Sequence, residues 1–166
     1  MKVMLDGCAI DWLLDNPSSA DFLTCIQAGT LDAFVSADVL IEVNCTPLKK
    51  GDRRQRLLGI AFSKLKIAPT AIPLVGRRRT SAKTPLRPRK KALSIVALPS
   101  AVAMHSNLLS LGIKKLDGVH LVEASLANAA FITTDKDDLL RKRSEIKKCC
   151  GVECLSPEEL LKALGC

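Results

Sequence analysis

A chain of 166 residues with a formal net charge of +8 is long enough to bury a hydrophobic core, and its length favours a single domain, 1–166. Aromatic residues make up only 3% of it and tyrosine is absent, so we expect a core of Leu, Ile, Val and Ala. No apolar run reaches the length of a membrane span, and the start becomes acidic at Asp6, too soon for a signal peptide.

Seven cysteines are present, an odd number, and no two of them form a C-x-x-C pair. This usage argues against a disulfide framework or a zinc ribbon, and it favours reduced thiols in a cytoplasmic protein. The cluster of Cys149, Cys150 and Cys154 leaves a site for a soft metal as an alternative, although no histidine lies near it in the sequence.

The positive charge is concentrated in one segment. Between Arg77 and Lys91 there are eight Lys or Arg residues and no acid, whereas the rest of the chain has 17 basic and 17 acidic residues. The segment contains Pro85 and Pro88 and shows no periodicity, which predicts an exposed loop within a basic insertion at about 73–98.

The first third of the chain alternates between strand and helix patterns. Lys2 to Leu5 predicts a strand that ends at Asp6, and Cys8 to Leu14 predicts a helix. The break at 16–19 offers a cap for a second helix, which is expected to stop near Gly29.

The pattern then repeats. Leu31 to Val35 predicts a strand, Ser36 caps a helix from Ala37 to about Cys45, and another helix follows with an apolar side up to Leu65. Two apolar runs, 67–75 and 92–98, flank the basic segment and are expected to pair weakly as edge strands.

The second half follows the same alternation. A helix is predicted from Pro99 to Gly112, and a second from Asp117 to about Asn128. A buried strand over 129–132 comes next, and the polar residues 133–135 are expected to begin another helix. The last elements are a strand over 152–155 and a helix with a strong start signal, formed by Ser156, Pro157 and Glu159.

Strands that alternate with helices along a whole chain predict an α/β protein with a parallel sheet covered on both faces. In such a sheet, ligands collect where the strands end. Asp6 and Asp135 each follow a strand, and Glu42 and Asp117 lie on helices that should border the same crevice.

Carboxylates that meet in one crevice repel one another unless a cation joins them. Hard oxygen ligands favour Mg²⁺ or Mn²⁺, which assist phosphoryl chemistry. The alternatives are that Asp117 and Asp135 only cap helices, and that Glu42 is an ordinary surface residue. The nucleotide-binding and hydrolase motifs G-x-x-x-x-G-K-[ST], G-x-G-x-x-G and G-x-S-x-G are all absent.

Four stretches of the sequence resemble the PIN-domain family of metal-dependent nucleases. They are MKVMLD at the start, VSADVLIEV, LGIKKLDGVHLVEASLANAAFITTDKDDLL, and VECLSPEELLKAL at the end. The resemblance implies an α/β/α sandwich of three layers with a mainly parallel central sheet. It also implies an acidic Mg²⁺ or Mn²⁺ site and cleavage of RNA. Many members resemble VapC-type toxins that an antitoxin protein holds, and a homodimer is compatible with the family.

Carried over residue by residue, the resemblance assigns the catalytic and metal-binding acids to Asp6, Glu42, Asp117 and Asp135. Thr133 matches the polar residue that supports the last acid, Asp138 is expected to support it as well, and His120 is expected to pack or support rather than to catalyse. The sequence departs from the family at Gly7 and Cys8, where hydroxyl or amide side chains are usual, so a supporting hydroxyl is lost. Cys8 is expected to be a small buried residue.

The function implied is metal-assisted hydrolysis of RNA phosphodiester bonds. The rival interpretation is a PIN fold that binds RNA or a protein without cutting. The basic segment is expected to attract the phosphate backbone, with a solvated loop or a docking strip for an acidic antitoxin as alternatives. The residues predicted to contact RNA are Arg77, Arg78, Arg79, Arg87, Arg89, Lys90 and Lys91.

Overall fold

The computed structural model describes residues 1–44, 51–68 and 99–165 of the chain. Within these residues the strands are β1 (Lys2–Leu5), β2 (Asp32–Ser36), β3 (Lys66–Ala68), β4 (Ala130–Ile132) and β5 (Cys154–Leu155). They form a five-stranded sheet in the order β3-β2-β1-β4-β5, and every neighbouring pair is parallel. The central strand is therefore the first in the sequence.

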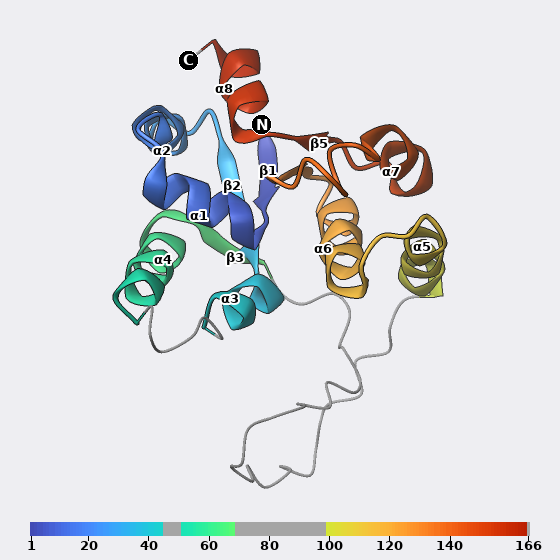
Figure 1. The fold of residues 1–166 in the computed structure, drawn as a ribbon. Helices are drawn as coiled ribbons and strands as arrows, with labels where there is room; N and C mark the ends of the chain where they lie inside the picture. Colours follow the sequence, from blue (N-terminus) through green and yellow to red (C-terminus); the bar gives the residue numbers. More distant parts are fainter. Residues whose placement is uncertain (45–50, 69–98, 166) are drawn as a thin grey trace, which may run out of the picture.

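Helices cover both faces of this sheet (Figure 1). Those before β4 are α1 (Gly7–Asp15), α2 (Ser19–Gln27), α3 (Ala37–Asn44), α4 (Gly51–Lys64), α5 (Pro99–Ser110) and α6 (Lys115–Leu126). Those after β4 are α7 (Arg143–Cys150) and α8 (Pro157–Leu164). Helices α1, α2 and α4 lie on one side of the strands, and α5, α6 and α7 lie on the other. The three-layer α/β/α architecture expected from the sequence is confirmed.

The two layers of core follow from the alternation of side chains along each strand. Val3 and Leu5 of β1 belong to the hydrophobic cluster beneath α1 to α4 and α8, whereas Met4 belongs to the cluster beneath α5 to α7. In β4, Ile132 faces the first cluster and Phe131 the second. Both strands are thus buried on both faces, as parallel strands require.

Local signals fix several of the helix ends. The predicted start of α8 is confirmed, because the Ser156 side chain accepts a hydrogen bond from the backbone of Glu159 and the Glu159 side chain accepts one from Ser156. Gly29 ends the α2 segment with a φ of +74°, a conformation that favours glycine. Helix α1 is tied to α4 by Arg53, whose Nη2 lies 2.6 Å from carboxylate oxygens of both Asp11 and Asp15.

One expectation about elements is wrong. No helix begins at residues 133–135, because 136–142 form consecutive turns and α7 begins only at Arg143. Strand β3 pairs with β2, and the expected pairing of the runs 67–75 and 92–98 stays a prediction. Residues 69–98, which include the basic segment and the run 92–98, lie outside the described residues. In the part of the chain that the structure describes, no helix is both long and apolar enough to cross a membrane.

Replacing Ser156 by alanine should lower the free energy of unfolding by about 1 kcal/mol, because the amide of Glu159 loses its acceptor. Chemical denaturation monitored by circular dichroism measures this change. Ser144→Ala is the control, since Ser144 is exposed on α7 and its replacement should leave stability nearly unchanged. Equal stabilities for both variants would contradict the role given to the cap.

Candidate functional site

The carboxyl ends of β1 and β4 bring together two of the predicted acids. Asp6 follows β1 directly, and its backbone amide donates to the carbonyl of Ile132 at 3.0 Å, which continues the ladder between the two strands. Asp135 follows β4 by three residues. Since β1 and β4 are parallel neighbours, both acids lie at the same edge of the sheet.

Both carboxylate oxygens of Asp6 are held in place. Oδ1 accepts a hydrogen bond from the amide of Gly7 at 2.6 Å, which makes Asp6 the cap of α1. Oδ2 accepts from the hydroxyl of Thr133 at 3.0 Å and from the thiol of Cys8 at 3.1 Å. Nδ1 of the buried His120 lies 4.0 Å from Oδ1. The orientation of this carboxylate is therefore fixed from several directions.

Thr133 links Asp6 to Asp135. Its hydroxyl donates to Asp6 and accepts from the backbone amide of Asp135 at 3.1 Å. Oδ1 of Asp135 in turn accepts from the amides of Asp137 at 3.1 Å and Asp138 at 2.9 Å. Asp135 therefore caps the turn that follows it.

Asp117 lies in the first turn of α6, whose cap is Lys114. Burial raises the pKa of the Asp117 carboxyl to about 6, and the negative charges of Asp6, Asp135 and Asp138 add to this rise, against an opposing effect of Lys114. A raised pKa with these causes shows that Asp117 lies within electrostatic range of the other acids. The charges of Asp6 and Asp135 thus both act on Asp117.

Lys114 is a member of this group that the sequence interpretation missed. Its Nζ lies 2.7 Å from Oδ2 of Asp138, and this pairing, together with the charges of Asp117 and Asp135, raises the pKa of the lysine. The spacing of three residues between Lys114 and Asp117 at a helix start was the available signal. The backbone amide of Asp138 donates to Asp135, while its carboxylate binds Lys114, and a supporting role of the Asp138 side chain stays a prediction.

The fourth predicted acid, Glu42, is half-buried on α3, the helix that begins where β2 ends. Its role as a ligand stays a prediction. On the same helix Asp38 is only 7% exposed, and its Oδ2 has no hydrogen-bond partner among the described residues. Buried carboxylates are normally hydrogen-bonded, so Asp38 is a second acid at this edge that the sequence interpretation did not single out.

The oxygen-rich character of these side chains fits Mg²⁺ or Mn²⁺. In the described ranges, however, no group of three or more His, Cys, Asp or Glu side chains is arranged as it would be around a metal ion. The carboxylates are near enough to repel one another but do not form a closed set of ligands.

The thiols elsewhere do not favour the alternative of a soft-metal site. Burial raises the pKa of Cys150, and it raises the pKa of Cys154 to about 12. Both thiols belong to the second hydrophobic cluster, where they pack as small apolar side chains. Burial and the charge of Asp6 likewise raise the pKa of Cys8, which keeps its S–H group at neutral pH.

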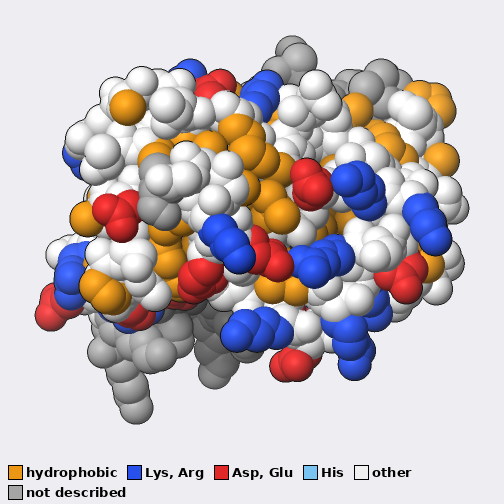
Figure 2. All heavy atoms as spheres, turned by 90° about the horizontal axis from the view of Figure 1, so that it is seen from above, with side chains coloured by type: hydrophobic (Ala, Val, Ile, Leu, Met, Phe, Trp, Pro, Cys, Tyr) orange, Lys and Arg blue, Asp and Glu red, His pale blue; other side chains and the backbone are white. Residues whose placement is uncertain are grey.

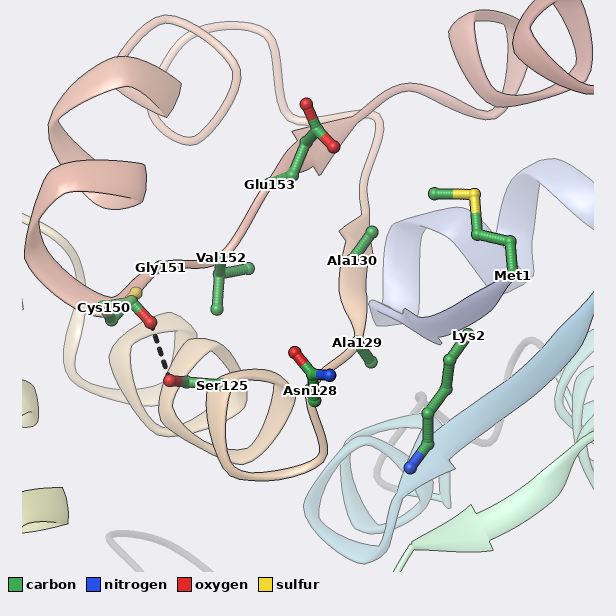
Figure 3. A pocket seen from close by; sticks show the side chains of 10 residues that line it. All are labelled: Met1, Lys2, Ser125, Asn128, Ala129, Ala130, Cys150, Gly151, Val152 and Glu153. Atoms are coloured by element: carbon green, nitrogen blue, oxygen red, sulfur yellow. Dashed lines mark hydrogen bonds between the residues drawn. The ribbon is translucent and has the colours of Figure 1, made fainter.

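The opposite edge of the sheet has a different character. A hollow of about 410 Å³ lies there, and none of the predicted site residues lines it (Figure 3). Ser125 and Cys150 meet in it, where the Ser125 hydroxyl donates to the Cys150 carbonyl at 2.7 Å. Figure 2 shows the amino-end face, on which basic and acidic side chains are mixed around a central hydrophobic region. This hollow is not the predicted acidic site.

No protein-family model and no curated protein matches the chain. Solved structures do match. One is VapBC2 from Rickettsia felis bound to a DNA fragment from their promoter, with a TM-score of 0.56 and 16% identity over 94% of this chain and 98% of that one. Another is PAE2754 from Pyrobaculum aerophilum, with a TM-score of 0.56 and 12% identity over 99% of this chain and 90% of that one.

These similarities extend over nearly the full length of each chain, so they cover the whole domain rather than a shared fragment. Together with the sheet order and the three layers, they show that the chain has the PIN-domain fold. The resemblance noted in the sequence is confirmed at this level.

Without divalent ions, Asp117→Asn should be more stable than the wild type at pH 7 by about 1–2 kcal/mol, because the raised pKa means that the charged form is disfavoured in the folded state. The wild type loses this stability as the pH rises from the ordinary value of 3.8 to about 6, so the difference should grow over that window and stay constant above it. Urea denaturation in EDTA across this pH range measures it.

Asp137→Asn is the matched control, because Asp137 is exposed in the neighbouring turn. It removes the same charge from the same region, and its effect on stability should be small. If Asp117→Asn were less stable than the wild type at pH 7, the repulsion inferred at Asp117 would be contradicted.

Proposed function

We propose that this chain is a Mg²⁺- or Mn²⁺-dependent endoribonuclease that hydrolyses phosphodiester bonds. The observation that carries the proposal is the crowding of Asp6, Asp117 and Asp135, which contributes to the rise of the Asp117 pKa to about 6. A perturbed carboxylate beside other acids at the carboxyl edge of a parallel sheet is typical of functional sites. The arrangement is unfavourable for the protein alone and becomes favourable with a cation.

In this proposal Asp6, Asp117 and Asp135 hold the ion, with Glu42 as the fourth ligand. A bound divalent ion supplies a more acidic water and neutralises charge that develops on the phosphoryl group. Thr133 orients Asp6 and the backbone of Asp135 at once. His120, which is 1% exposed, is too buried to reach RNA and supports Asp6 from behind.

The substrate proposed is RNA, attracted by positive charge on two parts of the chain. The ammonium of Lys114 lies beside the acids and is well exposed, so it can meet a substrate phosphate. The basic segment from Arg77 to Lys91 would add contacts to the backbone that are independent of base sequence. A docking strip for an acidic partner is the alternative role of this segment.

A partner protein is the second part of the proposal. VapBC2 from Rickettsia felis is similar in fold, and its structure is bound to promoter DNA. By analogy, the chain would act as the toxin of a toxin–antitoxin pair and be held by an antitoxin. A small adjacent reading frame with an acidic or DNA-binding product would support this role, and an isolated gene would count against it.

A second candidate function is binding without cleavage. The absence of a closed ligand group in the described residues favours it, and so does Gly7, which offers no side-chain hydroxyl next to Asp6. A PIN fold of this kind would bind RNA or a protein through its basic segment alone. Cleavage assays distinguish the two functions.

Incubation with single-stranded and structured RNA should give cleavage products only with Mg²⁺ or Mn²⁺, and EDTA should stop the reaction. Asp117→Asn should lower the rate by more than about 100-fold, the upper range for removal of even an indirect metal partner. Asp137→Asn is the control with the same change of charge and should retain activity. Equal cleavage by the wild type and Asp117→Asn, or none by either, would contradict the enzymatic proposal.

Deleting residues 77–91 should weaken RNA binding and leave the fold intact. Replacing the seven predicted contact residues by glutamine should do the same and flatten the dependence of log Kd on log salt by up to about 0.7 per lost phosphate contact for single strands. Filter binding at several salt concentrations measures both. Unchanged affinity at low salt would remove the segment from RNA recognition.

A further inference from the structure

Cys8, in the first turn of α1, lies where β1 and β4 end. Its Sγ is 3.1 Å from Oδ2 of Asp6, 3.2 Å from Oγ1 of Thr133, and 3.3 Å from the backbone nitrogen of Thr134. The thiol therefore contacts one side chain on its own element and two groups from the chain segment after β4. The sequence predicts that Cys8 is a small packing residue, and that role does not explain its three polar contacts.

The directions of these hydrogen bonds form a consistent chain. The amide of Thr134 donates to the sulfur, and the S–H group donates to Oδ2 of Asp6. The hydroxyl of Thr133 donates to the same oxygen. A group that donates and accepts at once is needed at this position, and a protonated thiol does both.

An apolar side chain of similar size at position 8 would remove two of these hydrogen bonds. It would leave the amide of Thr134 without its acceptor and Oδ2 of Asp6 with one donor fewer. The neighbouring residue cannot compensate, because Gly7 has no side chain, although nothing lies within 4 Å of where its Cβ would be. The support that a hydroxyl at position 7 would give therefore falls to Cys8 and Thr133.

We propose that Cys8 is a positioning residue, whose thiol bridges Asp6 and the backbone of Thr134 and so sets the separation of the two strand-end acids that hold the divalent ion. This inference rests on the proposed function, because it assumes that Asp6 and Asp135 are metal ligands. It goes further in assigning a role to a residue at which the sequence departs from the PIN-domain pattern.

The test is the affinity of the full chain for Mn²⁺, measured by isothermal titration calorimetry without RNA. Cys8→Ala should weaken binding by about 10-fold or more, the usual effect of removing a partner that orients a ligand. Cys8→Ser, which keeps a donor and an acceptor at a shorter reach, should recover most of the loss. Cys8→Val, which restores volume without polarity, should remain as weak as Cys8→Ala.

Thermal unfolding of the three variants in EDTA verifies that each is folded before its affinity is compared. If Cys8 only packs, the order changes: Cys8→Val should bind Mn²⁺ like the wild type, and Cys8→Ser should gain nothing over Cys8→Ala. That order, or equal affinities in all four proteins, would overturn the inference and leave the proposed function standing. A wild type that binds no Mn²⁺ would overturn both.

Discussion

The parallel pairing of β1 with β4 is the constraint on which the candidate site depends. It places Asp6 and Thr133, which are 127 residues apart in the sequence, within hydrogen-bond distance. Parallel strands end at the same edge of a sheet, so a residue that follows one strand meets a residue that follows the other. Burial of both faces by helices fixes the register of these strands, because a slip of one residue would exchange Met4 with Val3 and Leu5 between the two clusters.

The two explanations of the acids in the sequence, capping and ligation, do not exclude each other. Asp6 caps α1, and Asp135 caps the turn over 136–142, in each case through Oδ1. A capping hydrogen bond fixes the direction of the carboxylate through one oxygen and leaves the other oxygen to make different contacts. Asp117 differs, because it does not cap α6; that position belongs to Lys114. Burial and the neighbouring acids raise the pKa of the Asp117 carboxyl.

The features that the sequence predicts correctly are those determined by residues close together in the chain. The alternation of strands and helices, the burial of β1 and β4 and the start of α8 at Ser156 depend on patterns within a few residues, and all are confirmed. The helix expected at residues 133–135 is wrong, since the carboxylate of Asp135 caps consecutive turns over 136–142 and the next helix begins only at Arg143. Lys114, the cap of α6, binds Asp138 within these turns.

The same limit applies within the site. Asp38 stands out only after folding, through its burial. Lys114 has a signal in its spacing from Asp117, but its contact with Asp138 is visible only in the structure. Cys8 was assigned to packing because a sequence shows the size of a side chain but not the amide of Thr134, which approaches from the far end of the chain. Long-range contacts therefore decide the roles that composition leaves open.

Both chain ends lie on one side of the molecule. In Figure 1 the labelled N- and C-termini are at the top, beside the amino end of β1, whereas Asp6 follows the lower end of that strand. The amino group of Met1 is anchored there by a hydrogen bond to the Thr30 carbonyl at 2.7 Å. A surface, tag or fused protein attached through the amino end would therefore leave the opposite edge of the sheet, where β1 and β4 end, unobstructed.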